Sequence, residues 1–286
     1  LPAFSAGSHI DVHLPGGLVR QYSLCNDPAE SRHYRIAVLR DAASRGGSVA
    51  MHDQVREGDT LTISEPRNHF PLEHAPHTLL LAGGIGITPL LCMAQRLRAT
   101  GASFELHYAT RSLARTAFRD EIAAFGDRVK LHLDDGDAAQ KLDLPAVLAA
   151  QPEGTRLYVC GPTGFIDFVL STAKARGWPA DHLHLEYFGA APQDTTGDQA
   201  FEVRLASSGQ SYTVPADKTV VQALQEHGIE IMVSCEQGVC GTCLTRVLEG
   251  ECDHRDLYLT DEEKAANDQF TPCCSRAKSK VLVLDI

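Results

Sequence analysis

Three cysteines near the C-terminus have a spacing that suits a metal cluster. Cys235, Cys240 and Cys243 lie in the run Cys-Glu-Gln-Gly-Val-Cys-Gly-Thr-Cys. Further thiols follow after a long gap, at Cys273 and Cys274. The C-x4-C-x2-C…C spacing is the plant-type pattern for a 2Fe-2S cluster, in which four thiolates bind two irons. The sequence therefore predicts a 2Fe-2S site in the C-terminal part of the chain.

Two glycines interrupt the ligand run. Gly238 and Gly241 let the backbone curl tightly, which aims several thiols at one point and turns N–H groups toward the sulfurs. The identity of the fourth ligand is ambiguous at this stage. Cys273 and Cys274 are neighbours, and alternation of side chains lets only one of them face the cluster. We prefer Cys273.

Other metal or redox chemistry fits these cysteines less well. Cys240-Gly-Thr-Cys243 alone is typical of a thioredoxin-like redox pair or of half a zinc site. A redox pair needs no Cys235, however, and a zinc site needs a second close pair of ligands. Cys252-Asp-His254 imitates half of a Rieske motif, but no second Cys-x2-His pair follows. We interpret Cys252 as a loop thiol.

A second group of residues could hold a planar heterocycle and its phosphate. Arg20 and Tyr22 alternate on a predicted strand, so a cation and an aromatic ring share one face. Residues 45–48 read Arg-Gly-Gly-Ser and precede a short predicted helix. Glycine amides, a hydroxyl and a helix N-terminus could together receive a phosphate there. The plainer interpretation is structural: Tyr22 is an ordinary strand residue, and residues 45–48 form a simple glycine turn.

A third group lies at one edge of a predicted parallel sheet. Residues 83–89 read Gly-Gly-Ile-Gly-Ile-Thr-Pro, follow the first parallel strand and open a helix. Open α/β sheets bind a pyrophosphate at such a position. The G-x-G-x-x-G spacing is not met, so the usual dinucleotide fingerprint is absent. Cys160-Gly-Pro, which ends the next-to-last strand, points to the same edge, although a buried cysteine before a turn explains it equally well.

The elements that must position these groups fall into three segments, which predict a multidomain protein. Residues 1–73 predict an antiparallel β-barrel, and residues 74–188 predict an α/β domain with a parallel sheet covered on both faces. Residues 189–199 have linker composition, and residues 200–286 predict an α+β ferredoxin-like domain of the β-grasp type with a helix capped at Thr260. The predicted strands lie at 9–14, 19–24, 34–39, 60–63, 78–81, 104–108, 129–133, 157–159, 184–187, 201–205, 212–214 and 281–285, and the other predicted helices at 48–55, 89–98, 117–125, 165–175 and 220–227.

Composition narrows the class of protein. The chain has 286 residues, 43% of them apolar and 22% charged, which is typical of a soluble globular protein with more than one domain. Nine cysteines without an evident pairing pattern favour reduced thiols, and hence a cytoplasmic location. The longest apolar stretch, residues 79–93, is too short and too interrupted by Gly and Pro to predict a membrane span.

Charge and the chain start give two further expectations. A net charge of -11 argues against nucleic-acid binding, which needs basic patches. Residues 200–286 carry 14 Asp or Glu against 8 Lys or Arg; solubility is the plainer interpretation, and an acidic docking face for a partner is the functional one. The chain opens on Leu-Pro-Ala-Phe rather than on Met, so we expect a processed or excised piece.

The motifs together, in their order along the chain, resemble the phthalate dioxygenase reductase family within the ferredoxin-NADP reductase superfamily. The resemblance covers essentially the whole chain and departs only at the start, where the family's first strand is missing. It implies sites for FMN, NADH and a 2Fe-2S cluster. The residues carried over are Arg20, Tyr22 and Ser23 against FMN, with Ser23 near its N5; Gly46, Gly47 and Ser48 at the FMN phosphate; Gly84, Gly86, Thr88 and Cys160 at the nicotinamide nucleotide; Phe188 as the aromatic that covers the flavin; and Cys235, Cys240, Cys243 and Cys273 at the cluster.

The resemblance implies an oxidoreductase that carries electrons from NADH to a terminal oxygenase. NADH delivers two electrons as a hydride and a 2Fe-2S cluster accepts one at a time, so a flavin must couple them. Ser23, Cys160 and Phe188 are the expected catalytic residues. In the family the usual acceptor is a Rieske non-haem iron oxygenase for aromatic compounds. NADPH is not excluded, because Arg111 could tolerate a 2′-phosphate.

Three other functions stay open at this point. The chain could be a reductase module excised from a self-sufficient haem monooxygenase fusion. It could also be a non-catalytic ferredoxin-type electron carrier, which would bind no flavin and would not use NADH. A flavin oxidase with a vestigial cluster would turn over fully after Cys240 is replaced by serine.

Overall fold

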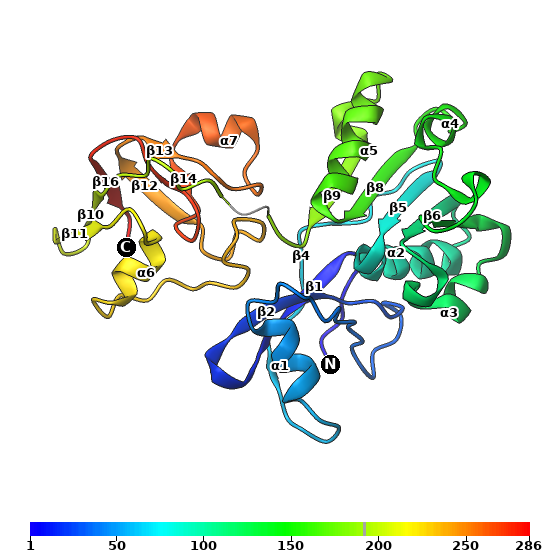
Figure 1. The fold of residues 1–286 in the computed structure, drawn as a ribbon, viewed down its shortest axis with the longest axis horizontal. Helices are drawn as coiled ribbons and strands as arrows, with labels where there is room; N and C mark the ends of the chain where they lie inside the picture. Colours follow the sequence, from blue (N-terminus) through cyan, green and yellow to red (C-terminus); the bar gives the residue numbers. More distant parts are fainter. Residues whose placement is uncertain (191–192) are drawn as a thin grey trace. The chain divides into compact units, whose positions relative to one another are not determined.

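The computed structural model describes residues 1–190 and 193–286, and the elements given below belong to these residues. They form two compact units, Leu1–Phe188 and Gly189–Ile286 (Figure 1). Ala191 and Pro192 of the expected linker lie outside the described residues. The boundary expected between residues 73 and 74 lies inside the first unit and stays a prediction. Among the described residues, no helix combines the length and apolar composition that crossing a membrane requires.

The N-terminal part of the first unit is a four-stranded antiparallel sheet. Its order is β2-β1-β3, and β4 also pairs with β1. On β1, Ile10 and Val12 turn into an apolar core with Leu24 and Ala50, because alternate residues of a strand face opposite sides. The elements are β1 (Ser8–His13), η1 (Pro15–Gly17), β2 (Val19–Ser23), α1 (Gly47–Asp53), β3 (Thr62–Ile63) and β4 (Arg67–Asn68).

The strand expected at residues 34–39 is wrong. The structure assigns no regular element there. The amide of Asn26 replaces a strand neighbour, because its Oδ1 accepts from Arg35 N at 2.9 Å and its Nδ2 donates to His33 O at 3.1 Å. Cys25 N also donates to Arg35 O at 2.8 Å. Side-chain bonds thus satisfy backbone groups that a ladder would otherwise pair, a competition that Asn commonly wins near turns.

A parallel five-stranded sheet forms the rest of the first unit, as predicted. Its order is β7-β6-β5-β8-β9, with β5 at the centre and buried along its whole length. The chain runs outward from β5 to β6 and β7 and then crosses to β8 on the other side of β5, so the strand order reverses at β5. The strands are β5 (Thr78–Gly83), β6 (Phe104–Thr110), β7 (Val129–Leu133), β8 (Arg156–Gly161) and β9 (Leu183–Tyr187).

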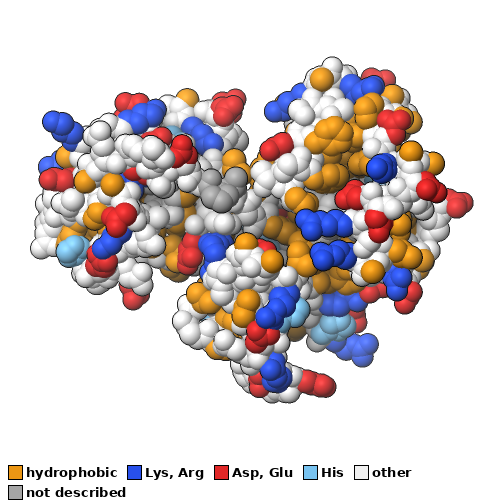
Figure 2. Space-filling view, in the orientation of Figure 1, with side chains coloured by type: hydrophobic (Ala, Val, Ile, Leu, Met, Phe, Trp, Pro, Cys, Tyr) orange, Lys and Arg blue, Asp and Glu red, His pale blue; other side chains and the backbone are white. Residues whose placement is uncertain are grey.

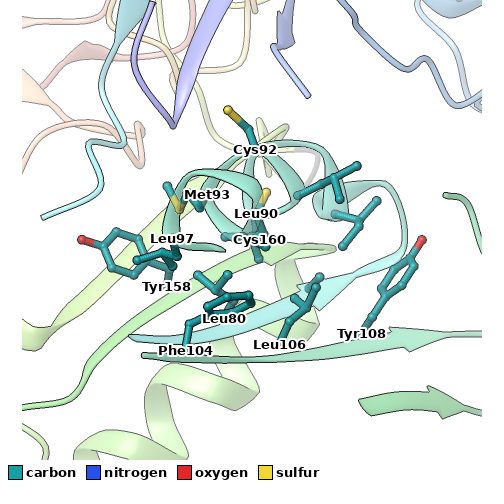
Figure 3. Packing of buried hydrophobic residues seen from close by; sticks show 14 of the residues in the cluster. Leu80, Leu90, Cys92, Met93, Leu97, Phe104, Leu106, Tyr108, Tyr158 and Cys160 are labelled. Atoms are coloured by element: carbon teal, nitrogen blue, oxygen red, sulfur yellow. The ribbon is translucent and has the colours of Figure 1, made fainter. Parts of the chain in front are cut away.

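Helices cover both faces of this sheet. On one face α2 packs with Leu80, Leu106 and Tyr158, and Figure 3 shows these side chains in one cluster with Cys160. On the other face α4 and α5 pack over Leu79, Leu81 and Val159. The helices are η2 (Gly84–Gly86), α2 (Ile87–Ala99), η3 (Leu113–Arg115), α3 (Arg119–Ala123), η4 (Gly126–Arg128), η5 (Ala138–Gln140), α4 (Leu144–Ala149), α5 (Thr163–Ala175) and η6 (Ala180–His182).

Two helices depart from expectation for identifiable reasons. Helix α3 begins at Arg119 rather than near Ala117, because Phe118 has φ +57°, a left-handed conformation that ends a helical run. Helix α4 was not predicted. Its start carries a signal that could have found it, since Asp143 caps the helix by accepting from Ala146 N at 3.1 Å and Pro145 lies in the first turn.

The second unit joins a mixed five-stranded sheet to two short helices. The sheet order is β11-β10-β16-β12-β14, and β13 pairs with β15 separately. The capping box predicted at Thr260 is confirmed: the Thr260 hydroxyl accepts from Glu263 N at 3.2 Å. The elements are β10 (Phe201–Leu205), β11 (Ser211–Val214), α6 (Val220–Gln225), β12 (Thr245–Glu249), β13 (Cys252–Asp253), α7 (Asp261–Ala266), β14 (Gln269–Phe270), β15 (Arg276–Ala277) and β16 (Val281–Leu284).

The surface mixes charges of both signs. On the face shown in Figure 2, Lys and Arg side chains are interspersed with Asp and Glu side chains. Large apolar side chains are also exposed in both units; in the second they include Met232, Leu244 and Leu257. Met232 and Leu244 flank the cysteine run in the sequence, and Leu257 N donates to Gly238 O within that run at 2.9 Å.

Candidate functional site

The loop between α6 and β12 brings the predicted cysteine ligands together. Cys235, Cys240, Cys243 and Cys273 are all buried. Hydrogen bonds join the thiol of Cys235 to those of Cys240 and Cys273, and they lower the pKa of Cys235. A further bond joins Cys243 to Cys273 and lowers the pKa of Cys243. Four thiols from two separate segments therefore converge on one place.

Glycine backbone geometry shapes this loop, as the sequence predicts. Gly238 and Gly241 have φ of +71° and +69°, values that L-residues with a side chain rarely adopt. The curl turns two amides toward a sulfur: Gln237 N and Val239 N lie 3.4 and 3.5 Å from Cys235 Sγ. Such N–H groups stabilise a thiolate and tune a cluster that the thiolate binds.

The neighbours Cys273 and Cys274 have different partners. Cys273 bonds to the thiols of Cys235 and Cys243. Cys274 Sγ instead lies 3.2 Å from Thr271 Oγ1 and 3.8 Å from Ser275 Oγ. Cys274 also bonds to the Cys273 thiol, but its other polar partners are these hydroxyl groups, whereas Cys273 joins two of the predicted ligands. This difference supports Cys273 as the fourth ligand.

The donor set fits a two-iron cluster better than a single ion. Among the described residues, no group of three or more His, Cys, Asp or Glu side chains is arranged around one ion. In a plant-type cluster each iron takes two of the four thiolates, so the thiols need not surround a common point at single-ion distance. Cys252 stays outside the group. It lies on strand β13, paired with Ala277, so the expectation of a loop thiol is wrong.

Arg20 and the glycine turn at residues 45–48 meet in the first unit. Arg20 Nη2 donates to Arg45 O at 3.1 Å. A Cβ added to Gly47 would lie 2.6 Å from Arg20 Cγ, so only glycine lets this side chain pass. Ser48 Oγ, in the first turn of α1, donates to Ser44 Oγ at 2.9 Å. A guanidinium and a hydroxyl thus lie at one turn, which is chemistry that suits a phosphate.

Tyr22 lies on the same face of β2 as Arg20. It pairs with Ile10 of β1 and packs against the N-terminal core. Burial raises the pKa of the Tyr22 phenol, so the ring stays neutral. Ser23 faces the opposite side of the strand and is 6% exposed. Arg20 and Tyr22 therefore share one face of β2, as predicted, and the hydroxyl of Ser23 lies on the other.

Gly84, Gly86 and Thr88, all predicted at the nucleotide site, have different structural roles in and after the turn that follows β5. Gly84 has φ +54°, and a Cβ there would meet nothing within 4 Å, so its backbone faces open space. A Cβ on Gly86 would lie 2.2 Å from Cys160 O, which makes Gly86 a close-packing position against β8. Thr88 is 2% exposed, and its Oγ1 donates to Ile85 O at 3.1 Å. Gly86 and Thr88 therefore build the turn that leaves Gly84 accessible.

The other predicted nucleotide-site residues lie at the same edge of the sheet with unequal exposure. Cys160 has no exposed surface, and burial followed by the nearby Glu186 raises the pKa of its thiol. Phe188 follows β9 and is 40% exposed. Arg111 follows β6 and is exposed. These positions come together because the strands are parallel and end at one edge.

Sequence reasoning missed Glu186, although it lies in β9 two residues before Phe188. Its Oε2 accepts a hydrogen bond from Ser23 Oγ at 3.3 Å, and it pairs in register with Cys160. Burial raises the pKa of Glu186 to about 8, while the bond from Ser23 opposes the shift. A carboxyl that holds its proton near neutral pH next to a predicted flavin residue is a functional-site feature. No local pattern marks it, because the partners lie on strands far apart in the chain.

Sequence reasoning also missed two residues behind the cysteine loop. A Cβ on Gly241 would lie 2.3 Å from the ring of Tyr258, so this ring packs directly on the loop. Asp256 is buried, and its Cα and Cβ pack against Gly238. The sequence identified Thr260 as a helix cap, but no motif marked Asp256 or Tyr258.

Known families match both units of the chain. Residues 203–278 match the family described as 2Fe-2S iron-sulfur cluster binding domain. Residues 67–183 match the family described as dimethylamine monooxygenase subunit DmmA-like, N-terminal domain. The first match covers all four converging cysteines.

Whole-chain relatives are more informative. The chain is 60% identical over 289 residues to a vanillate O-demethylase oxidoreductase of a Pseudomonas species, covering 100% of this chain and 91% of that protein. It is 43% identical over 290 residues to a phthalate 4,5-dioxygenase oxygenase reductase subunit of Pseudomonas putida, covering 100% of this chain and 88% of that protein.

Solved structures agree with these relatives. A structure of phthalate dioxygenase reductase is 43% identical, with a TM-score of 0.77, and is matched over 100% of this chain and 89% of its own. An intact self-sufficient cytochrome monooxygenase of type IV is also 43% identical, with a TM-score of 0.84, but this chain covers only 37% of it. The chain therefore belongs to the phthalate dioxygenase reductase family, together with the vanillate O-demethylase oxidoreductases.

Proposed function

We propose that this protein is an NADH-dependent oxidoreductase that passes electrons through FMN to a 2Fe-2S cluster and on to an oxygenase. The observation that carries the proposal is the meeting of four buried thiols in a chain that also joins Arg20 to a glycine turn and Ser23 to Glu186. When bound, the flavin accepts a hydride and releases electrons singly, and the cluster accepts them one at a time.

At the flavin site, the residues of this chain bind and orient. Arg20, Gly46, Gly47 and Ser48 would hold the phosphate, and Tyr22 would lie against the ring. Ser23 would direct its hydroxyl to the N5 edge, where Glu186 shares that hydroxyl at 3.3 Å. Because Glu186 holds a proton near neutral pH, the pair presents a neutral hydrogen-bonding edge to the reacting atoms.

At the nucleotide site, accessibility decides which residues touch the ligand. Gly84 offers an open backbone for the pyrophosphate, with Gly86 and Thr88 fixing the turn behind it. Phe188, 40% exposed, would cover the flavin until the nicotinamide displaces it. Cys160 has no exposed surface, so it would shape the wall of the nucleotide site at the end of β8. Arg111 could accept the 2′-phosphate of NADPH, so the choice of nucleotide stays open. Comparing kcat/KM for NADH and NADPH in the native protein and in Arg111→Ala decides between the two nucleotides.

The finer architecture also belongs to this proposal. We infer an FMN-binding β-barrel at residues 1–73, a NAD-binding α/β domain at residues 74–188, a linker at residues 189–199 and a β-grasp 2Fe-2S domain at residues 200–286. The antiparallel sheet at the start and the mixed sheet at the end support these assignments. The match to a cluster-binding family at residues 203–278 supports the last of them.

We infer that electrons leave at the cysteine loop toward an oxygenase. Met232, Leu244 and Leu257 flank the loop and are 78%, 36% and 42% exposed. Such apolar side chains around an acidic domain suit a transient contact with a partner whose face is basic at its rim. The names of two relatives refer to vanillate O-demethylase and phthalate 4,5-dioxygenase, which favours a Rieske non-haem iron oxygenase for an aromatic compound.

A second candidate is a module of a self-sufficient cytochrome monooxygenase. It is favoured by the match to such a protein over all of this chain. The coverage of 91% and 88% of two free-standing relatives favours the first function. Mixing the protein with each kind of oxygenase and measuring NADH-dependent product separates the two.

One anaerobic experiment tests the function as a whole. Protein reconstituted with FMN, iron and sulfide should absorb in the visible, bleach when NADH is added and develop the electron paramagnetic resonance signal of a reduced cluster. In Cys240→Ser, NADH should still bleach the flavin while reduction of cytochrome c is lost. A protein that binds no flavin would be a simple carrier, and full turnover of Cys240→Ser with cytochrome c would contradict the relay.

A further inference from the structure

Asp256 carries a buried carboxyl group directly behind the cysteine loop. The residue is 2% exposed, and its side chain has no exposed surface. Its Oδ2 accepts from Leu259 N at 2.7 Å and from Tyr258 N at 3.2 Å. A carboxyl group that accepts hydrogen bonds from two backbone N–H groups is held in one orientation. The carboxyl group is therefore fixed in place within the second unit.

The backbone that carries this carboxyl group packs against the loop of three thiols. A Cβ on Gly238 would lie 2.9 Å from Asp256 Cβ, so only the absence of a side chain lets the two backbones approach. Leu257 N donates to Gly238 O at 2.9 Å and closes the contact. Gly238 lies between Cys235 and Cys240, so Asp256 braces the loop at its middle.

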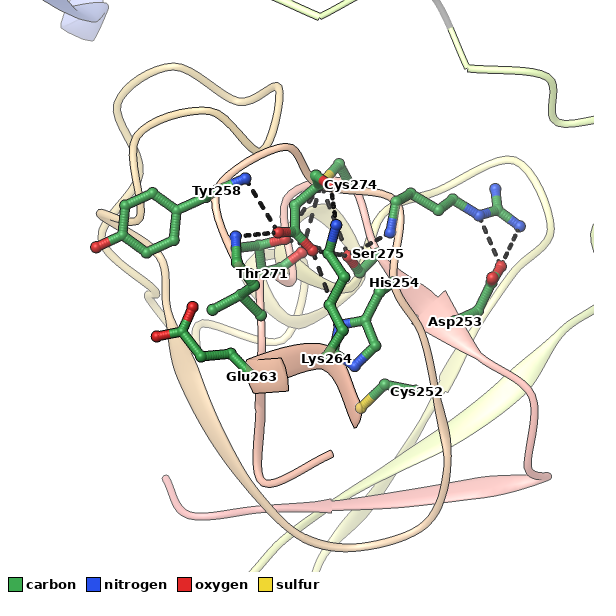
Figure 4. Close-up of polar contacts among 12 residues, drawn as sticks. Cys252, Asp253, His254, Tyr258, Glu263, Lys264, Thr271, Cys274 and Ser275 are labelled. Carbon is green, nitrogen blue, oxygen red and sulfur yellow. Dashed lines mark hydrogen bonds and ion pairs between the residues drawn. The ribbon is translucent and has the colours of Figure 1, made fainter. Parts of the chain in front are cut away.

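The same carboxyl group also reaches the segment that carries the fourth thiol. Its Oδ1 accepts from Ser275 Oγ at 3.5 Å, and that hydroxyl in turn accepts from Arg255 N at 3.1 Å. Ser275 N and Cys274 N both donate to Thr271 O, at 3.0 and 3.2 Å. Figure 4 shows Thr271, Cys274 and Ser275 gathered in this network. Cys273 is the residue immediately before the bonded pair, so its position follows from theirs.

His254 and Lys264 complete the surroundings. His254 Nδ1 lies 3.7 Å from Asp256 Oδ1, and Lys264 Nζ, from α7, donates to Asp256 O at 2.8 Å. Lys264 thus binds the backbone rather than the carboxylate. A buried carboxylate raises the energy of any additional negative charge nearby, because a protein interior screens charge less than water does. Placing an electron on a cluster next to it is therefore disfavoured.

We propose that Asp256 is the positioning residue of the cluster site. It fixes the loop of Cys235, Cys240 and Cys243 relative to the segment of Cys273, and its charge makes the cluster harder to reduce. The inference rests on the proposed function, because it concerns the cluster that the four thiols would bind. It assigns a role to a residue outside the ligand pattern, reached only through the folded network.

The test uses the full chain reconstituted with FMN, iron and sulfide. Asp256→Asn keeps the shape and removes the charge, so the midpoint potential of the cluster, followed by electron paramagnetic resonance, should become more positive. Asp268→Asn removes the same charge from an exposed position of the second unit and should leave the potential unchanged. Bleaching of the flavin by NADH should stay the same in both variants, since both changes lie outside the first unit.

The effect of the Asp256 charge on the potential and the bracing of the loop are tested separately. An Asp256→Asn protein that holds a full cluster at the native potential would overturn the charge effect. If Asp256→Asn holds no cluster, Ser275→Ala keeps the charge and removes one brace, and the visible circular dichroism of its cluster should change. A native spectrum in Ser275→Ala would overturn the bracing role. Native protein that fails to take up a cluster at all would instead overturn the proposed function.

Discussion

The hydroxyl of Ser23 donates a hydrogen bond to the carboxyl of Glu186 at 3.3 Å, although 163 positions separate the two residues. The bond joins β2 of the antiparallel sheet to β9 at one end of the parallel sheet. Glu186 also lies in register with Cys160. The proposed flavin and nucleotide sites therefore share one polar contact, which makes this pair the natural target for mutation.

Stability should depend on the protonation of Glu186. Its pKa rises from 4.5 to about 8 on folding, so the folded protein binds a proton that the unfolded chain loses. The stabilising contribution is complete below pH 4.5 and disappears as pH rises through 8. Glu186→Gln mimics the protonated form, so its melting temperature should match that of native protein at pH 4 and exceed it at pH 9. The exposed Glu153→Gln should show no such pH-dependent gain, and an equal difference at both pH values would contradict the assignment.

Removing the Ser23 hydroxyl should slow hydride transfer. Ser23→Ala deletes the donor to Glu186 and the group proposed to face N5, an interaction of about 1.4 kcal/mol, or about tenfold in rate. Stopped-flow bleaching of the flavin by NADH measures the step directly. Ser171→Ala, which removes an exposed hydroxyl of α5, serves as the control. A native bleaching rate in Ser23→Ala would remove Ser23 from the mechanism.

The neighbouring cysteines should behave differently when each is replaced by serine. Cys273 bonds to two of the converging thiols, so Cys273→Ser should lose the cluster or change its visible spectrum. Besides the thiol of Cys273, Cys274 bonds to the hydroxyl groups of Thr271 and Ser275, so Cys274→Ser should keep both the cluster and its spectrum. Iron and sulfide content, measured with the spectra, reports retention. The reverse pattern would assign the fourth ligand to Cys274.

The close packing of Gly86 predicts a loss of stability on substitution. A Cβ there would lie 2.2 Å from the backbone oxygen of Cys160, so Gly86→Ala must push β8 and the turn apart. Overpacking of this kind costs about 1–3 kcal/mol. Gly164→Ala is the matched control, because a Cβ at that helical position meets nothing within 4 Å. Thermal unfolding should show a lower melting temperature for Gly86→Ala alone, and equal effects in the two variants would contradict this reading of the turn.

The sequence determined those features that depend on neighbouring residues. The spacing of Cys235, Cys240 and Cys243, the glycines between them and the strand–helix alternation after residue 77 all act over a few positions, where backbone geometry sets the outcome. The expected strand at residues 34–39 failed because a side chain, that of Asn26, supplied the hydrogen bonds.

The tertiary structure alone decided which distant groups meet. Asp256 reaches Gly238 and Ser275, and Glu186 reaches Ser23, because strand order and loop closure bring those backbones together. No pattern of neighbouring residues encodes such contacts, since a burial-driven pKa and a brace across two segments exist only once the chain has packed. The sequence therefore specified the cofactors, and the fold specified the residues that hold and tune their surroundings.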